Sequence, residues 1–244
     1  MTAKELFNAG QLNAAIQALV AVLRDNPADT RQRTFLFELL CFAGEYDRAE
    51  KHLEIIAQES PDATTGALLY RAALAAERTR REVFEKAQYS DPASTPESHS
   101  GTLNGQPFQS LEDADPRLGP RLEIFAAGDY LWLPLEHVAS IQMEAPKRLR
   151  DLLWIPATVL TGPSFNGQEL GQVLIPALSP FSFKHADDAV RLGRVTVWEE
   201  QGGEAVPFGQ KMLLVDGEEI PLLEVRSLEL NAAETTPQAH ASAQ

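Results

Sequence analysis

The sequence predicts an α+β fold in which a helical repeat is followed by a mostly antiparallel β domain with short helices. Three observations support this prediction. The first ninety residues match themselves at an offset of 34 residues, whereas the later part consists of short apolar runs broken by proline and glycine. The two parts also differ in charge, with 11 basic and 13 acidic side chains in residues 1–90 against 10 and 22 in residues 91–244. Such a shift in composition indicates two structural units.

The self-match places residues of the same kind in equivalent positions. Gly10 and Gly44 each end a helix, where a left-handed residue is needed. Ala15 and Ala49 let antiparallel helices approach closely. The other matched pairs are Leu12 with Tyr46, Leu19 with Leu53, Val22 with Ile56, and Pro27 with Pro61. This pattern resembles the tetratricopeptide repeat, although a plain helical bundle remains the alternative.

The repeat predicts a helical domain over residues 1–89. Its helices are expected at 2–9, 12–25, 29–43, 46–59 and 63–88. The last of them begins a third repeat, but Arg78 stands where glycine is expected, so this helix continues and caps the stack.

The inner face of such a stack commonly receives a peptide or a helix. In the second repeat that face carries Arg31, Thr34, Glu38, Cys41 and Phe42, and in the last helix it carries Thr65, Leu68, Ala72 and Ala75. Small and apolar residues there favour an apolar guest helix. The alternative is that the second half of the chain itself covers this face.

The second half begins after a segment at 90–109 that is expected to be a linker or loop, since residues 90–101 contain no large apolar side chain. Seven apolar runs between 122 and 225 predict strands, and Asp216–Gly217 predicts a hairpin turn. Short helices are expected at 110–115, 135–140 and 146–151. The domain is expected to span 110–230, with a disordered tail at 231–244.

Composition excludes several classes of function. The formal net charge of −14 disfavours nucleic acid and anionic membrane as partners. No apolar run is long enough to span a membrane, and the single cysteine fits the reducing cytoplasm. Phosphate-binding glycine loops are absent, and the five histidines lack metal-ligand spacing, so neither a cofactor nor a metal is expected.

The run Glu112, Asp113 and Asp115 is the most suggestive acidic cluster. It could hold a cation or a basic partner segment, or it could cap a helix. Trp132 is an aromatic anchor for either the core or an interface. Two alternative functions remain open at this point. One is a hydrolase using Asp113, Asp115, Asp151 or His137, and the other is a scaffold that dimerises through the repeat.

Several long blocks resemble one known family. They read SLEDADPRLGPRLEI at 110–124, GDYLWLPLE at 128–136, APKRLRDLLWIPA at 145–157, LGRVTVW at 192–198 and FGQKMLL at 208–214. These blocks resemble the ImpE (TagJ/SciE) family of type VI secretion accessory proteins, and with the helical part the resemblance covers about residues 1–230. The sequence departs from the family pattern at 160–172 and 177–182.

The resemblance implies a cytoplasmic, non-catalytic accessory protein without a cofactor. It implies two partners. One is the N-terminal helix of the small sheath protein of the type VI secretion system, and the other is the AAA+ ATPase that recycles the sheath. Candidate partner-binding residues are those of the repeat's inner face and of the acidic run, namely Arg31, Thr34, Glu38, Phe42, Leu68, Ala72, Glu112, Asp113, Asp115 and Trp132.

Overall fold

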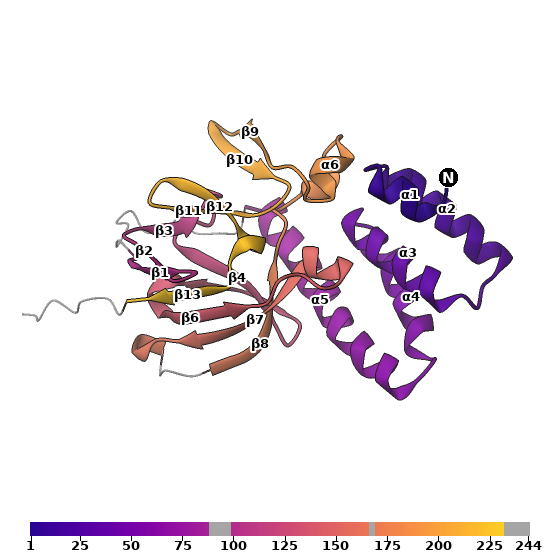
Figure 1. Cartoon of the computed structure of the whole chain (residues 1–244), viewed down its shortest axis with the longest axis horizontal. Helices are drawn as coiled ribbons and strands as arrows, with labels where there is room; N and C mark the ends of the chain where they lie inside the picture. Colours follow the sequence, from indigo (N-terminus) through magenta and orange to yellow (C-terminus); the bar gives the residue numbers. More distant parts are fainter. Residues whose placement is uncertain (88–98, 166–168, 232–244) are drawn as a thin grey trace, which may run out of the picture.

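The computed structural model describes residues 1–87, 99–165 and 169–231. Figure 1 shows a stack of helices beside a strongly curved β domain, with α5 lying between the other helices and the sheet. The expected α+β class, with a helical repeat followed by an antiparallel β domain, is therefore confirmed.

Five helices form the stack: α1 (Ala3–Asn8), α2 (Leu12–Asp25), α3 (Thr30–Phe42), α4 (Tyr46–Ala57) and α5 (Pro61–Glu85). The residue just before the helix caps three of them, since Thr2, Asp29 and Ser60 each accept a backbone N–H of the first helical turn. As expected, α5 continues through Arg78 to residue 85. None of the described helices is both long and apolar enough to cross a membrane.

The main sheet has eight antiparallel strands in the order β2, β1, β13, β6, β7, β8, β4, β5. Their bounds are β2 (Gln106–Phe108), β1 (Gly101–Leu103), β13 (Ser227–Leu230), β6 (Val138–Met143), β7 (Trp154–Thr161), β8 (Glu169–Pro176), β4 (Arg121–Ala126) and β5 (Asp129–Pro134). Its inner face packs on an apolar cluster that includes Ile124, Val159 and Ile175.

Two smaller sheets complete the β domain. One contains β3 (Leu111–Asp113), β11 (Met212–Val215) and β12 (Glu218–Pro221), and the other pairs β9 (Val197–Gln201) with β10 (Glu204–Phe208). The expected turn at Asp216–Gly217 joins β11 to β12. The only described α-helix in this half is α6 (Asp188–Arg191), accompanied by 3₁₀ turns such as Leu149–Leu152.

Two expectations about the start of the β domain are corrected. Residues 101–108, expected within the linker, form β1 and β2, because Gly101–Leu103 pairs with β13 at the sheet edge. Residues 88–98 of that linker and 232–244 of the expected tail lie outside the described residues. Residues 111–113, expected in a short helix, form β3 and pair with β11. The alternation of buried Leu111 and Asp113 with half-buried Glu112 is the two-residue period of a strand.

The two halves share one apolar core. A single cluster of buried side chains contains residues of α1–α5 together with Phe125, Leu153, Trp154, Leu174, Leu178 and Leu192 from the β half. Trp154 stacks on Tyr70 of α5, with 6.2 Å between ring centroids. Packing across the whole boundary therefore holds the helical stack against the sheet.

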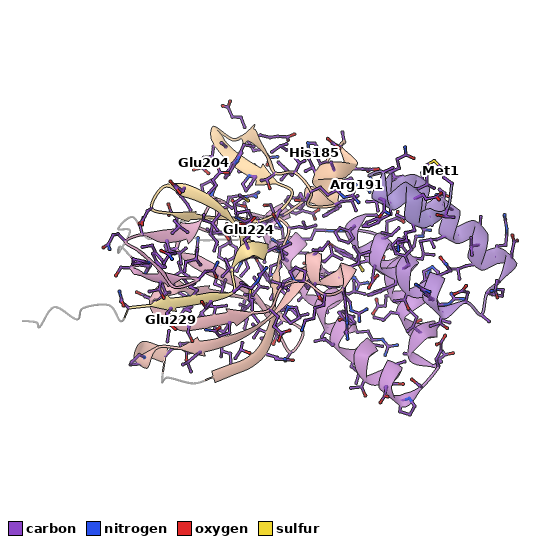
Figure 2. The ribbon with its side chains drawn as sticks, viewed as in Figure 1. Met1, His185, Arg191, Glu204, Glu224 and Glu229 are labelled. Carbon is purple, nitrogen blue, oxygen red and sulfur yellow. The ribbon has the colours of Figure 1, made fainter. Side chains whose placement is uncertain are left out.

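The segment around α6 binds the first repeat through polar contacts. Asp188 accepts the backbone N–H of Leu12 at 2.8 Å and so caps α2. Arg191 reaches Asn13, and Arg194 donates to the carbonyls of Phe7 and Asn8 at the end of α1. Figure 2 shows Arg191 on α6 pointing toward these N-terminal helices.

The two repeat glycines provide a matched test of this packing. Both have a positive φ, but a Cβ on Gly44 would lie 2.4 Å from the Phe183 ring, whereas a Cβ on Gly10 would meet only Arg194 at 3.5 Å. We expect Gly10→Ala to cost about 1 kcal/mol of unfolding free energy, from backbone strain. Gly44→Ala should cost at least about 1 kcal/mol more, because Phe183 must move. Urea denaturation measures both, and equal costs would contradict this packing.

Candidate functional site

A cleft of about 660 Å³ lies between α5 and the outer face of the main sheet. Its lining runs from the end of β6 across β7 and β8 to the turn that joins β4 and β5. Figure 1 shows the β7–β8 side of the sheet approaching α5. The cleft combines an apolar wall, a floor with polar side chains and a basic end.

The wall is one face of α5. Leu69, Ala72 and Ala73 line the cleft, and their spacing of three and four residues places them on the same side of the helix. Leu69 is 49% exposed despite being a large apolar side chain. The turn at Gly128 closes one end, because a Cβ there would lie only 3.6 Å from the Cβ of Ala72. Gly128 has φ +97°, which favours glycine.

The floor consists of side chains aligned by strand register. Gln142 of β6 pairs with Thr158 of β7, which pairs with Gln172 of β8, so three uncharged polar residues form one row. Pro156, Leu174 and Phe125 form a neighbouring apolar row. Residues two apart along a strand face the same side, so both rows belong to one face of the sheet. This surface offers hydrogen-bonding groups beside apolar contacts.

Lys147 and Arg148 line the other end of the cleft. Their backbone N–H groups both donate to the Asp151 carboxylate, at 2.9 and 2.8 Å. The Lys147 ammonium forms an exposed ion pair with Glu144. Asp151 therefore fixes the turn that presents two cationic side chains beside the apolar wall.

A buried set of charges joins α5 to the sheet. Arg80 of α5 donates two hydrogen bonds to Glu123 of β4, at 2.7 and 2.9 Å. Lys211 lies 2.5 Å from Glu123 and 2.6 Å from Asp113 of β3. All four side chains are at least 94% buried. Because the two cations and two carboxylates balance, the set is electrically neutral, and it fixes the position of α5 relative to the floor of the cleft.

The environment of these groups sets their protonation. Arg80 and Lys211 overcome the effect of burial and hold the pKa of Glu123 far below its usual range. Burial raises the pKa of Asp113 to about 6, a shift that the ion pair with Lys211 only partly offsets. Burial also raises the pKa of the Tyr130 phenol, which donates a hydrogen bond to Glu123.

The inner face of the second repeat is largely covered by the chain itself, which corrects part of the expected binding surface. Glu38 forms an ion pair with Arg150 at 3.1 Å, and Phe42 is buried in the shared core. Arg31 and Thr34, at the start of α3, keep exposed surface. The last helix differs, because Ala72 lines the cleft and Leu68 is 59% exposed beside it.

The acidic run does not form a shared binding surface. Asp113 pairs with Lys211, and Asp115 with Arg117 at 2.6 Å, so both are buried in ion pairs. Glu112 lies half-buried on β3. Trp132 of β5 packs on Phe84 and Tyr130 beside α5. None of these four residues lines the cleft, and Trp132 contacts α5 through Phe84.

The four residues considered for hydrolysis do not converge. Asp113 and Asp115 form the ion pairs described above, Asp151 holds the Lys147–Arg148 turn, and His137 lies beside Phe165 with 5.6 Å between ring centroids. Within 1–87, 99–165 and 169–231, no group of three or more His, Cys, Asp or Glu side chains is placed to hold a metal ion.

Sequence reasoning missed the polar row Gln142, Thr158 and Gln172. These residues are far apart in the chain, and only strand register brings them together. The pairing of Lys211 with Glu123 could not be predicted from the sequence either, because the two residues are far apart in the chain. Lys147 and Arg148 are adjacent in the sequence, but their place at a cleft depends on the fold.

Removing one carboxylate from the buried charge set tests its role. Glu123→Gln leaves two buried cations without their shared anion, so we expect a loss of about 3–5 kcal/mol in unfolding free energy. The exposed ion pair of Glu82 with Lys86 provides the control, and Glu82→Gln should change stability by less than about 1 kcal/mol. Urea denaturation measures both variants. Similar small losses would show that the buried set does not hold the halves together.

The raised pKa of Asp113 gives a pH dependence. Its ordinary value is 3.8 and its folded value is about 6, so between these values the folded state holds a proton that the unfolded chain releases. The contribution of Asp113 to stability therefore falls as pH rises through this window, by roughly 3 kcal/mol in all. The unfolding free energy of the wild type minus that of Asp113→Asn should decrease from pH 4 to pH 7. An increase would mean that Lys211 keeps Asp113 ionised.

Comparison with known proteins identifies both halves. The ImpE protein family profile matches residues 105–229, and a tetratricopeptide repeat profile matches residues 6–77. The chain is 34% identical over 262 aligned positions to the type VI secretion system accessory component TagJ of Pseudomonas aeruginosa strain PAO1. That alignment covers 94% of this chain and 91% of the relative.

A solved structure shares the fold. The crystal structure of protein VPA1032 from Vibrio parahaemolyticus superposes with a TM-score of 0.82 at 22% identity, covering 95% of this chain and 98% of that one. The helical repeat and the curved sheet thus recur together in one arrangement. The family profile, together with the TagJ alignment over nearly the whole chain, shows that this protein belongs to the ImpE family, alongside an accessory component of the type VI secretion system.

Proposed function

We propose that this protein is a non-catalytic, cytoplasmic accessory component of a type VI secretion system that binds the N-terminal helix of the small sheath subunit in the cleft between α5 and the sheet. The observation that carries the proposal is the open cleft itself, where Leu69 remains half-exposed beside Ala72. The TagJ relative supports the accessory role. Holding this helix would change how the AAA+ recycling ATPase engages the sheath.

The dimensions of the cleft suit one helical segment. Two turns of α-helix are about 11 Å long and 10 Å across, which corresponds to a volume on the order of 900 Å³. A cleft of about 660 Å³ can therefore enclose the inner side of such a segment while its outer side faces solvent. An amphipathic helix has this division between an apolar and a polar side.

The position of the cleft also supports the proposal. Leu69 and Ala72 belong to the last helix of the repeat, and Ala72 lies on the face expected to receive a guest. On the equivalent surface of α3, Glu38 is paired with the chain's own Arg150 and Phe42 is buried. The guest would therefore dock on the part of the inner face that stays open.

A charged substitution in the apolar wall tests the docking site. Leu69→Asp would place a carboxylate against the apolar face of the bound helix, so binding to the purified small sheath subunit should weaken at least about tenfold. Val22→Asp on α2 is the matched control, since Val22 is 42% exposed and lies outside the cleft lining. Isothermal titration calorimetry with the full chain measures both variants, and circular dichroism checks their folding.

The same titration with a sheath subunit lacking its first helix tests the partner. Loss of binding is expected because that helix supplies the apolar face. Unchanged binding without the helix, or equal affinity of Leu69→Asp and the wild type, would contradict the proposal. Absence of any binding by the wild type would do so as well.

A further inference from the structure

We propose that the cleft selects a guest helix with an acidic C-terminal end, which lies against Lys147 and Arg148. This inference rests on the proposed function and adds the charge and direction of the bound helix. It is carried by the arrangement of charge along the cleft, because the charged lining residues gather at one end and the other is closed by the uncharged turn at Ala127 and Gly128. At the charged end Glu144 pairs with Lys147 and Asp151 accepts two backbone N–H groups, which leaves the Arg148 guanidinium facing a guest.

The basic end stands out against the charge of the whole molecule. The chain carries a formal net charge of −14, and 22 of its 35 acidic residues lie after residue 90. Lys147 and Arg148 nevertheless sit together on the cleft lining in this acidic half, and both are exposed. No described carboxylate forms an ion pair with Arg148, so its charge is available to a guest.

The two cations are held in place rather than being carried on a loose loop. Asp151 accepts both backbone N–H groups, and the 3₁₀ turn Leu149–Leu152 follows directly. Arg150 in this turn pairs with Glu38 of α3 and stacks over Tyr70 of α5. The turn is therefore tied to α3 and to α5, the apolar wall of the cleft, which fixes where the positive charge lies relative to the guest.

Helix electrostatics gives the direction. A helix carries partial negative charge at its C-terminus, and the carbonyl groups of its last turn lack partners within the helix. Cations at one end of the cleft therefore favour a guest whose C-terminus points toward them. Acidic side chains in its last turns would add charge-assisted contacts.

The two sides of the cleft set the rotation of the guest. The apolar side of the helix faces Leu69, Ala72 and the row that contains Leu174. The flank that faces Gln142, Thr158 and Gln172 carries polar groups, because amide and hydroxyl groups both donate and accept hydrogen bonds. The surface thus fits an amphipathic helix with its apolar side toward α5 and a polar flank toward the row Gln142, Thr158 and Gln172.

Glu144 gives the proposal a distinctive test because it opposes the two cations. It lines the same end of the cleft and pairs with Lys147 at the exposed surface. An acidic guest would be repelled by Glu144 and would compete for Lys147. Removing the Glu144 charge should therefore strengthen binding, whereas reversing the two cations should weaken it.

The experiment titrates full-length chains with the purified small sheath subunit at two salt concentrations. The electrostatic screening length is about 10 Å at the lower one, about 0.1 M, and about 4 Å at the higher one, about 0.5 M. We expect Lys147→Glu with Arg148→Glu to weaken binding about tenfold at low salt, and Glu144→Gln to strengthen it two- to threefold. Both effects should shrink at high salt. Arg24→Glu is the matched control, since Arg24 is exposed at the end of α2, and it should leave affinity unchanged.

The direction is tested from the partner's side. Replacing acidic residues in the last turns of the sheath helix with lysine should restore binding to the Lys147→Glu, Arg148→Glu chain, and the same changes in the first turns should not. Wild-type affinity that depends on Leu69 but responds to neither charge variant would overturn this inference and leave the proposed function standing. Restored binding after lysine substitutions in the first turns of the sheath helix would mean that the helix lies in the opposite direction, and it would also overturn this inference. Failure of the wild type to bind would remove both proposals.

Discussion

The buried contact of Glu123 with both Arg80 and Lys211 is the constraint on which the rest of the molecule depends. It joins the last helix of the repeat to strand β4 where no water can replace the lost hydration of the charges. Such charges are costly to bury, so they remain stable only when each keeps its partner. The two halves of the chain therefore take one relative position, and α5 belongs to both.

That fixed position divides the inner face of the repeat into a filled part and an open part. The filled part is covered by the turn at Leu149–Leu152, where Arg150 pairs with Glu38 of α3, and by Trp154, which stacks on Tyr70 of α5. The open part lies along Leu69 and Ala72. A short repeat cannot bury its own inner face, and the chain uses its β half to complete it while leaving one recess for a partner. The family relation to a secretion accessory component agrees with such an adaptor role.

Much of the fold could be predicted from local patterns. The repeat glycines, the capping residues and the Asp216–Gly217 turn each act within a few residues of sequence, and these elements are confirmed. The acidic run at 112–115 was less predictable, because Asp113 meets Lys211 across 98 residues and the segment pairs as a strand. Ala72 of the expected inner face lines the cleft, whereas Glu38 and Phe42, predicted by the same pattern, are covered. Local spacing identifies a surface, but only tertiary packing decides what occupies it.

Hydrogen–deuterium exchange of the full chain, with and without the purified small sheath subunit, tests the central claim most directly. We expect new protection confined to the wall, the floor and the charged end of the cleft, in residues 69–73, 142–148, 155–158 and 172–174. The exposed surface of α2 and the β9–β10 hairpin should exchange as before. Protection that maps instead to α1–α4, with the cleft unchanged, would contradict it.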